Sequence, residues 1–385
     1  MVGKFNSKIF AAIKVFLLLM ILLATAELRA QQRNVKFTHL TNLDGLSQSS
    51  VETFLKDKQG YMWFGTQDGL NKYDGYKFTV YRHKLKDPKS LRRNYIYSLY
   101  EDHAGNLWVG TNNGGLSLYD RKHDSFVNYQ AEPDNPNKLS NNSITSIYED
   151  KRNNLWIGTY YNLNLFNRKT GKVIRFEADS ANQSSLSHPS ITCMVEDQKH
   201  NFWVGTQDGL NILDRNTKKF KRFVNQQSDS TSISSNYILG ITEDDAGNLW
   251  IGTDNGINLF DFKTQKFTRL QNDPQNTNSL TNNRITGIED AGKGELWIGT
   301  ADGLDRFNTR SKTFTHFRSI NTDERSLART SSINSMFYDK SGILWVCTSE
   351  GGINIYDKNL SYLDLYRNNP NNYETLSFNN VTGFA

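Results

Sequence analysis

The sequence is poor in the residues that build disulfide frameworks and metal sites. Among its 385 residues are two cysteines, six prolines and seven histidines. Cys193 and Cys347 stand in unlike local sequences, Ile-Thr-Cys-Met-Val and Leu-Trp-Val-Cys-Thr, so we do not expect a disulfide between them. The histidines never pair at the spacing that metal ligands require. We therefore predict a protein that needs no metal and no other cofactor.

Long runs of lysine and arginine are also missing. The formal net charge is +5, from 45 basic and 40 acidic residues. Residues 1–30 hold four of the basic residues and one of the acidic residues, which leaves 41 basic against 39 acidic residues in the remainder. A nearly neutral body without basic runs argues against nucleic acid or anionic lipid as a partner.

Only one hydrophobic run stands out, and it lies near the start. Residues 15–24 are apolar, which is short for a membrane span of about 20 residues. Three lysines precede the run, and Ala24-Thr25-Ala26 fits the small-residue rule for cleavage, with cleavage after Ala30 as a second option. We predict a signal peptide over residues 1–30 and a periplasmic protein with no other membrane contact. An uncleaved membrane anchor is the alternative.

The tryptophans reveal an internal repeat. All seven are separated by 45 to 48 residues, and each stands in a sequence close to Leu-Trp-Ile-Gly-Thr; they are Trp63, Trp108, Trp156, Trp203, Trp250, Trp297 and Trp345. Each unit contains four short runs rich in β-branched and aromatic residues, separated by polar turns, and no helical spacing. A period of this length with four strands per unit is typical of propeller blades. We predict an all-β, seven-bladed β-propeller with four-stranded antiparallel blades.

Turn residues repeat with the tryptophans. An aspartate stands six residues before Trp in six units, and the sixth unit has Asp290 one place earlier. Three residues before Trp each unit has Gly, Asn or His, which accept the positive φ of a tight hairpin. The Gly of Trp-x-Gly-Thr indicates close approach between blades. We interpret the aspartates as acceptors for the turn backbone, not as a catalytic or calcium-binding series.

Ring closure follows from the strand count. The seventh unit offers three strands that end at residues 353–357, and residues 35–40, Val35-Lys-Phe-Thr-His-Leu40, resemble a fourth strand without a blade. We predict that Val35–Leu40 completes the last blade, so that the propeller spans residues 31–357. Residues 358–385 resemble the start of a second propeller that is cut off. In the alternative arrangement Tyr362–Tyr366 closes the ring.

The repeated motifs resemble a known family. Trp-x-Gly-Thr-x-x-Gly-Leu, preceded by Leu-Ser-x-Asn-x-Ile and by x-Glu-Asp, resembles the two-component regulator propeller repeat over about residues 35–385. The resemblance implies an exported sensor region, usually with a second propeller, a β-sandwich, one transmembrane helix and a histidine kinase or GGDEF diguanylate cyclase. It also implies glycan fragments as ligands. A complete second propeller, a sandwich, a membrane helix and an output domain are absent from this sequence, so the resemblance extends to the sensor part.

Candidate binding residues are those that break the repeat. The turn after strand two and the loop leading into strand one share a face, here called the variable face; the Asp-bearing turns lie on the opposite, hairpin face. On the variable face tyrosine can stack on sugars, and arginine suits carboxylates or sulfates. We predict a site for an acidic or sulfated oligosaccharide from Arg93, Tyr95, Tyr160, Tyr161, Arg284 and Arg329. Alternatively, these side chains contact a second propeller or only water.

The predicted function is recognition without catalysis. The acidic residues keep the symmetry of the repeat, whereas a catalytic site should break it, and no nucleophile, phosphate-loop or metal motif occurs. We predict the sensor propeller of a transmembrane signalling receptor, with an oligosaccharide ligand and with a second propeller and downstream signalling domains as partners. A protein-interaction scaffold without a small ligand, or a propeller hydrolase or lyase, are the alternatives.

Overall fold

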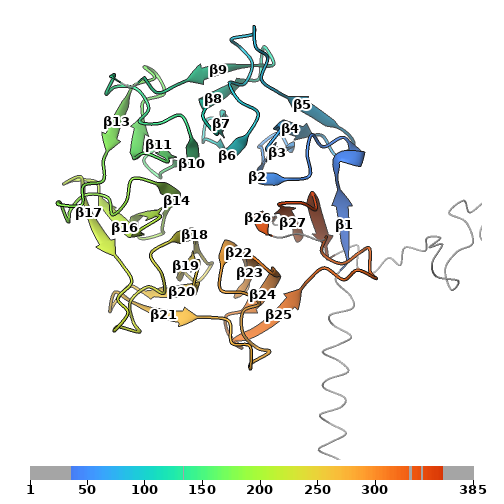
Figure 1. The fold of residues 1–385 in the computed structure, drawn as a ribbon, viewed down its shortest axis with the longest axis vertical. Coiled ribbons are helices and arrows are strands. Elements are labelled where there is room, and N and C mark those ends of the chain that lie inside the picture. The colour runs from blue at the N-terminus through green and yellow to red at the C-terminus, as the bar shows by residue number, and fades with distance from the viewer. Residues whose placement is uncertain (1–35, 133, 329–331, 340, 359–385) are drawn as a thin grey trace, which may run out of the picture. The chain divides into compact units, whose positions relative to one another are not determined.

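Seven four-stranded antiparallel sheets surround a common axis in a computed structural model of the chain (Figure 1). The structure describes residues 36–132, 134–328, 332–339 and 341–358. The propeller is the compact unit Phe37–Ile355, and a second unit comprises Met1–Lys36 and Tyr356–Ala385. The seven-bladed fold predicted from the repeat is confirmed. The predicted signal peptide and nearly all of the predicted second propeller lie outside the described residues.

Each blade contributes one strand to each of four concentric positions. The innermost strands are β2 (Val51–Lys56), β6 (Ile96–Glu101), β10 (Ile144–Glu149), β14 (Ile191–Glu196), β18 (Ile238–Glu243), β22 (Ile285–Gly292) and β26 (Ile333–Tyr338). The second strands, which carry the tryptophans, are β3 (Met62–Thr66), β7 (Leu107–Thr111), β11 (Leu155–Thr159), β15 (Phe202–Thr206), β19 (Leu249–Thr253), β23 (Glu295–Thr300) and β27 (Ile343–Thr348).

The outer half of each blade completes the sheet. The third strands are β4 (Gly69–Tyr73), β8 (Gly115–Asp120), β12 (Leu163–Phe166), β16 (Gly209–Asp214), β20 (Gly256–Asp261), β24 (Gly303–Asn308) and β28 (Ile353–Asp357). The outermost strands are β5 (Phe78–Tyr81), β9 (Ser125–Tyr129), β13 (Val173–Phe176), β17 (Lys219–Phe223), β21 (Lys266–Leu270), β25 (Thr313–Phe317) and β1 (Phe37–Leu40). We number the blades 1 to 7 from β2 to β26.

The ring closes through the start of the chain. The sheet of blade 7 has the order β1-β28-β27-β26, so the N-terminal strand takes the outermost position in the last blade. This confirms the predicted closure, with β1 running from Phe37 to Leu40; Val35 lies outside the described residues. A one-turn 3-10 helix, Asn42–Asp44, then leads into blade 1.

Tryptophan packing joins each blade to the next. Trp203 of blade 4 is fully buried and packs against Leu249, Ile251 and Phe260 of blade 5. Equivalent clusters surround four other tryptophans, each at the junction between its own blade and the next; they are Trp63, Trp108, Trp156 and Trp250. The hydrophobic core is therefore divided among the interfaces between blades and does not lie at the axis.

Two repeated backbone features permit this packing. A Cβ atom added to Gly65 would lie 2.7 Å from Ile96 of the next blade, and one added to Gly252 would lie 2.6 Å from Ile285. The glycine of Trp-x-Gly-Thr therefore marks close approach between blades, as predicted. At the first turn, Asn153 and His200 adopt φ of 62° and 64°, and so take the left-handed conformation that glycine has in other blades.

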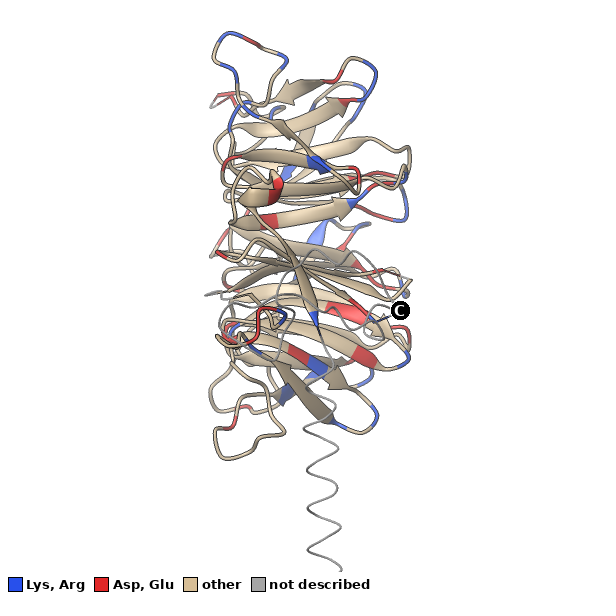
Figure 2. Ribbon diagram, turned by 90° about the vertical axis from the view of Figure 1, so that its right-hand side faces the viewer, with Lys and Arg blue, Asp and Glu red and all other residues tan. Residues whose placement is uncertain are grey.

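The connecting loops gather on two opposite faces of the propeller when it is viewed from the side (Figure 2). Lysine and arginine are interspersed with aspartate and glutamate on both faces. Within the described residues, no helix is long and apolar enough to cross a membrane.

Candidate functional site

A β-bulge in the innermost strand recurs in all seven blades. The register shifts after the first residue of each strand, for example between Ile96 and Ser98 in β6. Such a bulge leaves one residue outside the ladder and redirects its side chain. We call the seven bulged residues the bulge ring; they are Glu52, Tyr97, Thr145, Thr192, Leu239, Thr286 and Asn334. The ring surrounds the axis near the variable face; three of its members are threonine and the other four differ from one another.

Two members of the bulge ring, Glu52 and Tyr97, are linked through neighbouring side chains of blades 1 to 3. The ring of Tyr97 lies 4.6 Å from that of Tyr95 and 5.9 Å, nearly perpendicular, from that of Tyr160, centroid to centroid. The hydroxyl of Tyr160 donates to that of Tyr97 at 3.3 Å. Tyr95 donates to Glu52 Oε1 at 3.2 Å, and Gln67 Nε2 donates to the same oxygen at 2.8 Å. We call Glu52, Gln67, Tyr95, Tyr97 and Tyr160 the tyrosine–glutamate cluster.

The hydroxyls of Tyr95 and Tyr97 stay protonated at neutral pH. Desolvation, reinforced by the charge of Glu52, raises the pKa of Tyr95 to about 12. Burial likewise raises the pKa of Tyr97 well above its usual value, with the neighbouring Tyr160 as the next cause. Tyr160 keeps 41% of its surface exposed. The cluster therefore offers aromatic faces, hydroxyl donors and one carboxylate acceptor to a molecule on the variable face.

The structure brings two of the six predicted site residues together. Tyr95 and Tyr160 meet through Tyr97 in the cluster. Tyr161 is 61% exposed, and Arg93 is exposed on the loop into β6, with its stem beside Gly114. The Arg284 guanidinium lies 5.9 Å from the ring of Tyr237, across the axis from β6 (Figure 1). Arg329 lies outside the described residues.

Sequence reasoning missed Glu52, Gln67 and Tyr97. Tyr97 lies within the innermost strand, where the repeat search looked only for β-branched and aromatic character. The available signal was a comparison of the second residue of each innermost strand, which is Thr in three blades and is replaced by Glu52 in blade 1 and Tyr97 in blade 2. The bulge that directs these side chains toward the axis cannot be read from that comparison.

The repeated aspartates of the hairpin face accept hydrogen bonds from the turn backbone and from the tryptophan indole. In blade 2, Asp102 Oδ1 accepts from the backbone amides of Ala104 and Asn106, and its Oδ2 accepts from the indole Nε1 of Trp108 at 2.9 Å. Burial favours the neutral form, but the hydrogen bonds from Trp108, Asn106 and Arg168 outweigh it and lower the pKa of Asp102. The structural interpretation of these carboxylates is confirmed. Asp290 of blade 6 differs: its Oδ1 accepts from the amide of Gly292, and desolvation raises its pKa.

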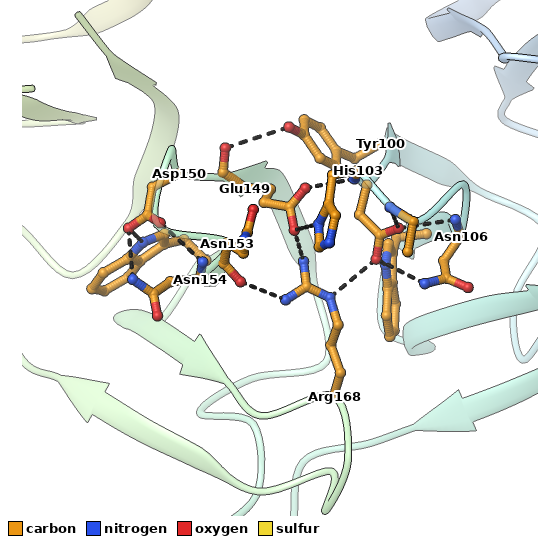
Figure 3. Close-up of polar contacts among 12 residues, drawn as sticks. Tyr100, His103, Asn106, Glu149, Asp150, Asn153, Asn154 and Arg168 are labelled. Atoms are coloured by element: carbon orange, nitrogen blue, oxygen red, sulfur yellow. Dashed lines mark hydrogen bonds and ion pairs between the residues drawn. The ribbon is translucent and has the colours of Figure 1, made fainter.

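Arginines connect successive blades on the hairpin face, a feature that the sequence analysis also missed. Arg168 of blade 3 donates through Nε to Asp102 of blade 2 at 3.0 Å and through a second nitrogen to Glu149 of its own blade (Figure 3). His103 Nδ1 lies 2.7 Å from Glu149 Oε1 in the same network. Arg121 and Arg215 bridge blades 1–2 and 3–4 in the same way. We call Arg121, Arg168 and Arg215 the interblade arginines.

The series of interblade arginines ends at blade 5. Phe262 occupies the equivalent position there, and Lys199 Nζ lies 3.4 Å from the centroid of its ring. Glu243, which corresponds to Glu149, keeps a hydrogen bond from the amide of Gln198, but its Oε1 is buried without a hydrogen-bond partner. Desolvation raises the pKa of Glu243. Within the described residues, no group of three or more His, Cys, Asp or Glu side chains is placed to hold a metal ion, and Cys193 and Cys347 are free thiols.

The sequence comparison identifies the repeat. The family described as "Two component regulator propeller" matches residues 45–68, 90–113, 138–161, 185–208 and 232–255. Five of the seven repeats of this chain thus match the two-component regulator propeller family. One matched stretch falls in each of blades 1 to 5. It runs from the loop before the innermost strand to the turn after Trp-x-Gly-Thr. A curated relative, histidine kinase P4 of Formosa agariphila, is 44% identical over 79 residues, which are 20% of this chain and 6% of that protein.

Solved structures extend the likeness to the whole propeller. The extracellular domain of the putative hybrid two-component system BT3049 from B. thetaiotaomicron is 29% identical, covers 84% of this chain and 42% of its own length, and superimposes with a TM-score of 0.71. The corresponding domain of BT4673 from the same organism is 22% identical, covers 83% and 39% of the two chains, and has a TM-score of 0.67. The propeller of this chain is thus homologous to extracellular sensor domains of hybrid two-component systems.

A third neighbour shares the fold alone. Virginiamycin B lyase from Staphylococcus aureus is 15% identical, covers 84% of this chain and 98% of its own, and has a TM-score of 0.61. The chain spans about two fifths of the length of the two-component domains that it matches and a small part of histidine kinase P4.

Proposed function

We propose that the chain is the ligand-binding propeller of an extracytoplasmic sensor, and that its ligand is a glycan fragment bound on the variable face. The observation that carries this proposal is the tyrosine–glutamate cluster. Three tyrosines and one carboxylate gather at blades 1 to 3. The position of Glu52 and Tyr97 holds Thr, Leu or Asn in the other blades, and the position of Tyr160 holds Gln, Asn, Asp, Ala or Ser. Aromatic faces that keep polar tips suit the apolar faces and hydroxyl groups of sugars.

Two arginines would make the proposed site selective for negatively charged ligands. Arg93 lies on the loop into β6, the strand that carries Tyr97, and Arg284 lies beside Tyr237 on the opposite side of the axis. Guanidinium groups bind carboxylates and sulfates through paired hydrogen bonds. The ligand class that this set favours is an acidic or sulfated oligosaccharide.

The receptor context is part of the proposal. The homologous domains are longer than this chain and belong to hybrid two-component systems. A periplasmic location, a second propeller and a histidine kinase or diguanylate cyclase output would complete such a receptor. A ligand would then signal by binding one arrangement of the rigid modules more tightly than another, because only differential affinity shifts a conformational equilibrium.

Binding without turnover is the proposed activity. The repeated carboxylates hold turns, indoles and arginines in place, as in Asp102 and Glu149, and so are not available as a catalytic pair. The likeness to virginiamycin B lyase supports the fold and carries no argument for lyase chemistry. Incubation of the purified protein with each bound oligosaccharide, followed by product analysis, separates a sensor from an enzyme.

The proposal is tested with an array of defined oligosaccharides, neutral, uronate-containing and sulfated. We expect the protein to bind a subset, and the Tyr97→Ala/Tyr160→Ala double variant to lose that binding while melting at the wild-type temperature. Tyr76→Ala is the matched control, because Tyr76 is a 95% exposed tyrosine on the hairpin face. Binding to no oligosaccharide, together with capture of a protein partner on the variable face, would favour the scaffold alternative.

A further inference from the structure

A cavity on the hairpin face lies outside the site described above. It has a volume of about 610 Å³ and opens at the junction of blades 3 and 4. The turn between β10 and β11 contributes Arg152, the turn between β14 and β15 contributes His200, and β16, β17 and their connecting turn form the rest of the wall. The volume falls within the range of small-molecule sites, roughly 300–1,000 Å³.

The cavity wall is dominated by cations. Arg152, Arg215, Lys219 and Lys221 line it, together with His200. Its one lining carboxylate, Asp214, accepts hydrogen bonds from the amide of Asn216 at 2.9 Å and from the hydroxyl of Thr217 at 2.8 Å. These hydrogen bonds lower the pKa of Asp214 and keep it charged, so the wall carries one carboxylate against four lysine and arginine side chains.

Three of these cations have no acidic partner. Arg215 is an interblade arginine and is paired with buried Asp150 and Glu196 at 3.4 and 3.1 Å. Arg152, Lys219 and Lys221 are exposed, and among the described residues no carboxylate lies within ion-pairing distance of them. Lys221 instead lies 5.0 Å from the ring of Phe223 and contacts the side chain of Gln265. A concave wall with one sign of unpaired charge concentrates anions.

The other blades do not repeat this combination. Ala104 and Ala246 stand at the position of Arg152 in blades 2 and 5, and Val127, Ile174, Thr268 and Thr315 stand at the position of Lys221. Basic residues do recur at the position of Arg152, as Lys199 and Lys293, and at the position of Lys219, as Lys77, Lys172 and Lys266, but without a basic residue at the position of Lys221 in those blades. A charge pattern that appears once in a sevenfold repeat is not needed by the blade architecture.

We propose that this cavity is a second binding site, on the face opposite the tyrosine–glutamate cluster, and that it takes the sulfate or carboxylate group of an anionic saccharide. Arg152 and Lys221 flank the oxyanion, and Lys219 adds charge at the outer edge. The side chain of Ile212, which is partly exposed in the wall, faces the sugar ring. The proposal does not depend on which ligand the variable face binds.

The test is isothermal titration calorimetry on the full chain at low and at physiological ionic strength. The probes are a monosulfated disaccharide, the same disaccharide without sulfate, a uronate-containing disaccharide and sodium sulfate. We expect the charged disaccharides to bind more tightly than the neutral one, with affinity that falls as salt rises. The Arg152→Gln/Lys221→Gln variant should weaken binding by about tenfold, since each exposed charge pair contributes roughly 0.2–1 kcal/mol.

Two matched controls make the result specific to this cavity. Lys266→Gln removes the counterpart of Lys219 in blade 5, and Lys293→Gln removes the exposed counterpart of Arg152 in blade 6; neither should change binding of the sulfated disaccharide in this cavity. Equal affinity for the sulfated and neutral forms, equal binding by the double variant, or equally tight binding of free sulfate would overturn the proposal. Loss of binding in Tyr97→Ala alone would place the anionic ligand on the variable face and leave the proposed function intact.

Discussion

The indole Nε1 of Trp203 donates a 2.8 Å hydrogen bond to Oδ2 of Asp197, six residues earlier in the same hairpin. The same bond joins Trp and Asp in blades 1, 2, 3 and 5. Tryptophan buries its rings between blades and needs a partner for its single donor, and aspartate supplies that partner while it also holds the turn backbone. One pair of residues therefore accounts for the conservation of spacing within the repeat.

Replacing Trp203 with alanine should destabilise the propeller severely. The side chain is fully buried against blade 5, so its removal leaves a cavity between blades and removes the indole donor to Asp197 Oδ2. We expect a loss of about 3–5 kcal/mol in the free energy of unfolding, measured by chemical denaturation. Tyr161→Ala, at a 61% exposed position, should leave unfolding nearly unchanged. Similar midpoints for the two variants would contradict the buried role of Trp203.

Loss of an interblade arginine should have an intermediate effect. Arg168→Ala leaves the buried carboxylates of Asp102 and Glu149 without their guanidinium partner. We expect a loss of about 2 kcal/mol, typical of hydrogen bonds to charged groups. Arg82→Ala is the control, because the Arg82–Asp68 pair is nearly half exposed on both sides and should contribute less than about 1 kcal/mol. Equal losses in the two variants would show that Arg168 does not join the blades.

His316 makes stability depend on pH near neutrality. It hydrogen-bonds to buried Asp305 at 2.7 Å, and this bond raises the pKa of His316 above its usual value of 6.5 despite the opposing effect of burial. The stabilisation is therefore fully present below pH 6.5 and is lost as pH rises through the higher folded-state pKa. The difference in Tm between wild type and His316→Gln should be largest near pH 6 and shrink toward pH 9.

The matched control for His316 is His123→Gln, since the side chain of His123 is 61% exposed. That variant should change Tm little over the same range. A Tm difference for His316→Gln that grows with pH would reverse the sign that the Asp305 contact requires.

Glu289 provides a second pH dependence, at the junction of blades 6 and 7. Desolvation raises the pKa of its carboxyl from 4.5 to about 8, although the residue keeps some exposed surface. The folded protein thus holds a proton that the unfolded chain releases, so stability falls as pH rises from about 4.5 to about 8. The amide of Glu289→Gln does not ionise, so the variant should be more stable than wild type above pH 8.

Thermal melts from pH 4 to 9 check this expectation, with exposed Glu324→Gln as the control. Near pH 4.5 wild type and Glu289→Gln should melt alike, and their curves should separate as pH rises. Parallel curves throughout that range would mean that Glu289 ionises normally in the folded protein.

The fold was largely predictable from sequence because the repeat exposes it seven times. Trp spacing, the turn glycines and the unpaired strand before blade 1 predicted seven blades and the closure by β1. Each signal is local in the chain and is reinforced by its copies. Asn153 and His200, which replace glycine in two turns, were recognisable for the same reason.

The candidate site was predictable only in part. Tyr95 and Tyr160 were found because they lie in turns and loops, where departures from the repeat are visible. Tyr97 and Glu52 were missed because a β-bulge directs them toward the axis, and strand register is set by pairing across the blade. The interblade arginines were missed because their partners lie in the preceding blade, more than sixty residues away in the chain.

The central claim is that repeated side chains build the ring and that recognition comes from the residues that break the repeat. Its most direct test is the ratio of dissociation constants of the Tyr97→Ala/Tyr160→Ala variant and wild type for the oligosaccharide that binds most tightly on the array. The account predicts at least about a tenfold weaker complex, or 1.4 kcal/mol, with unchanged melting. Equal dissociation constants in a variant that folds normally would contradict it.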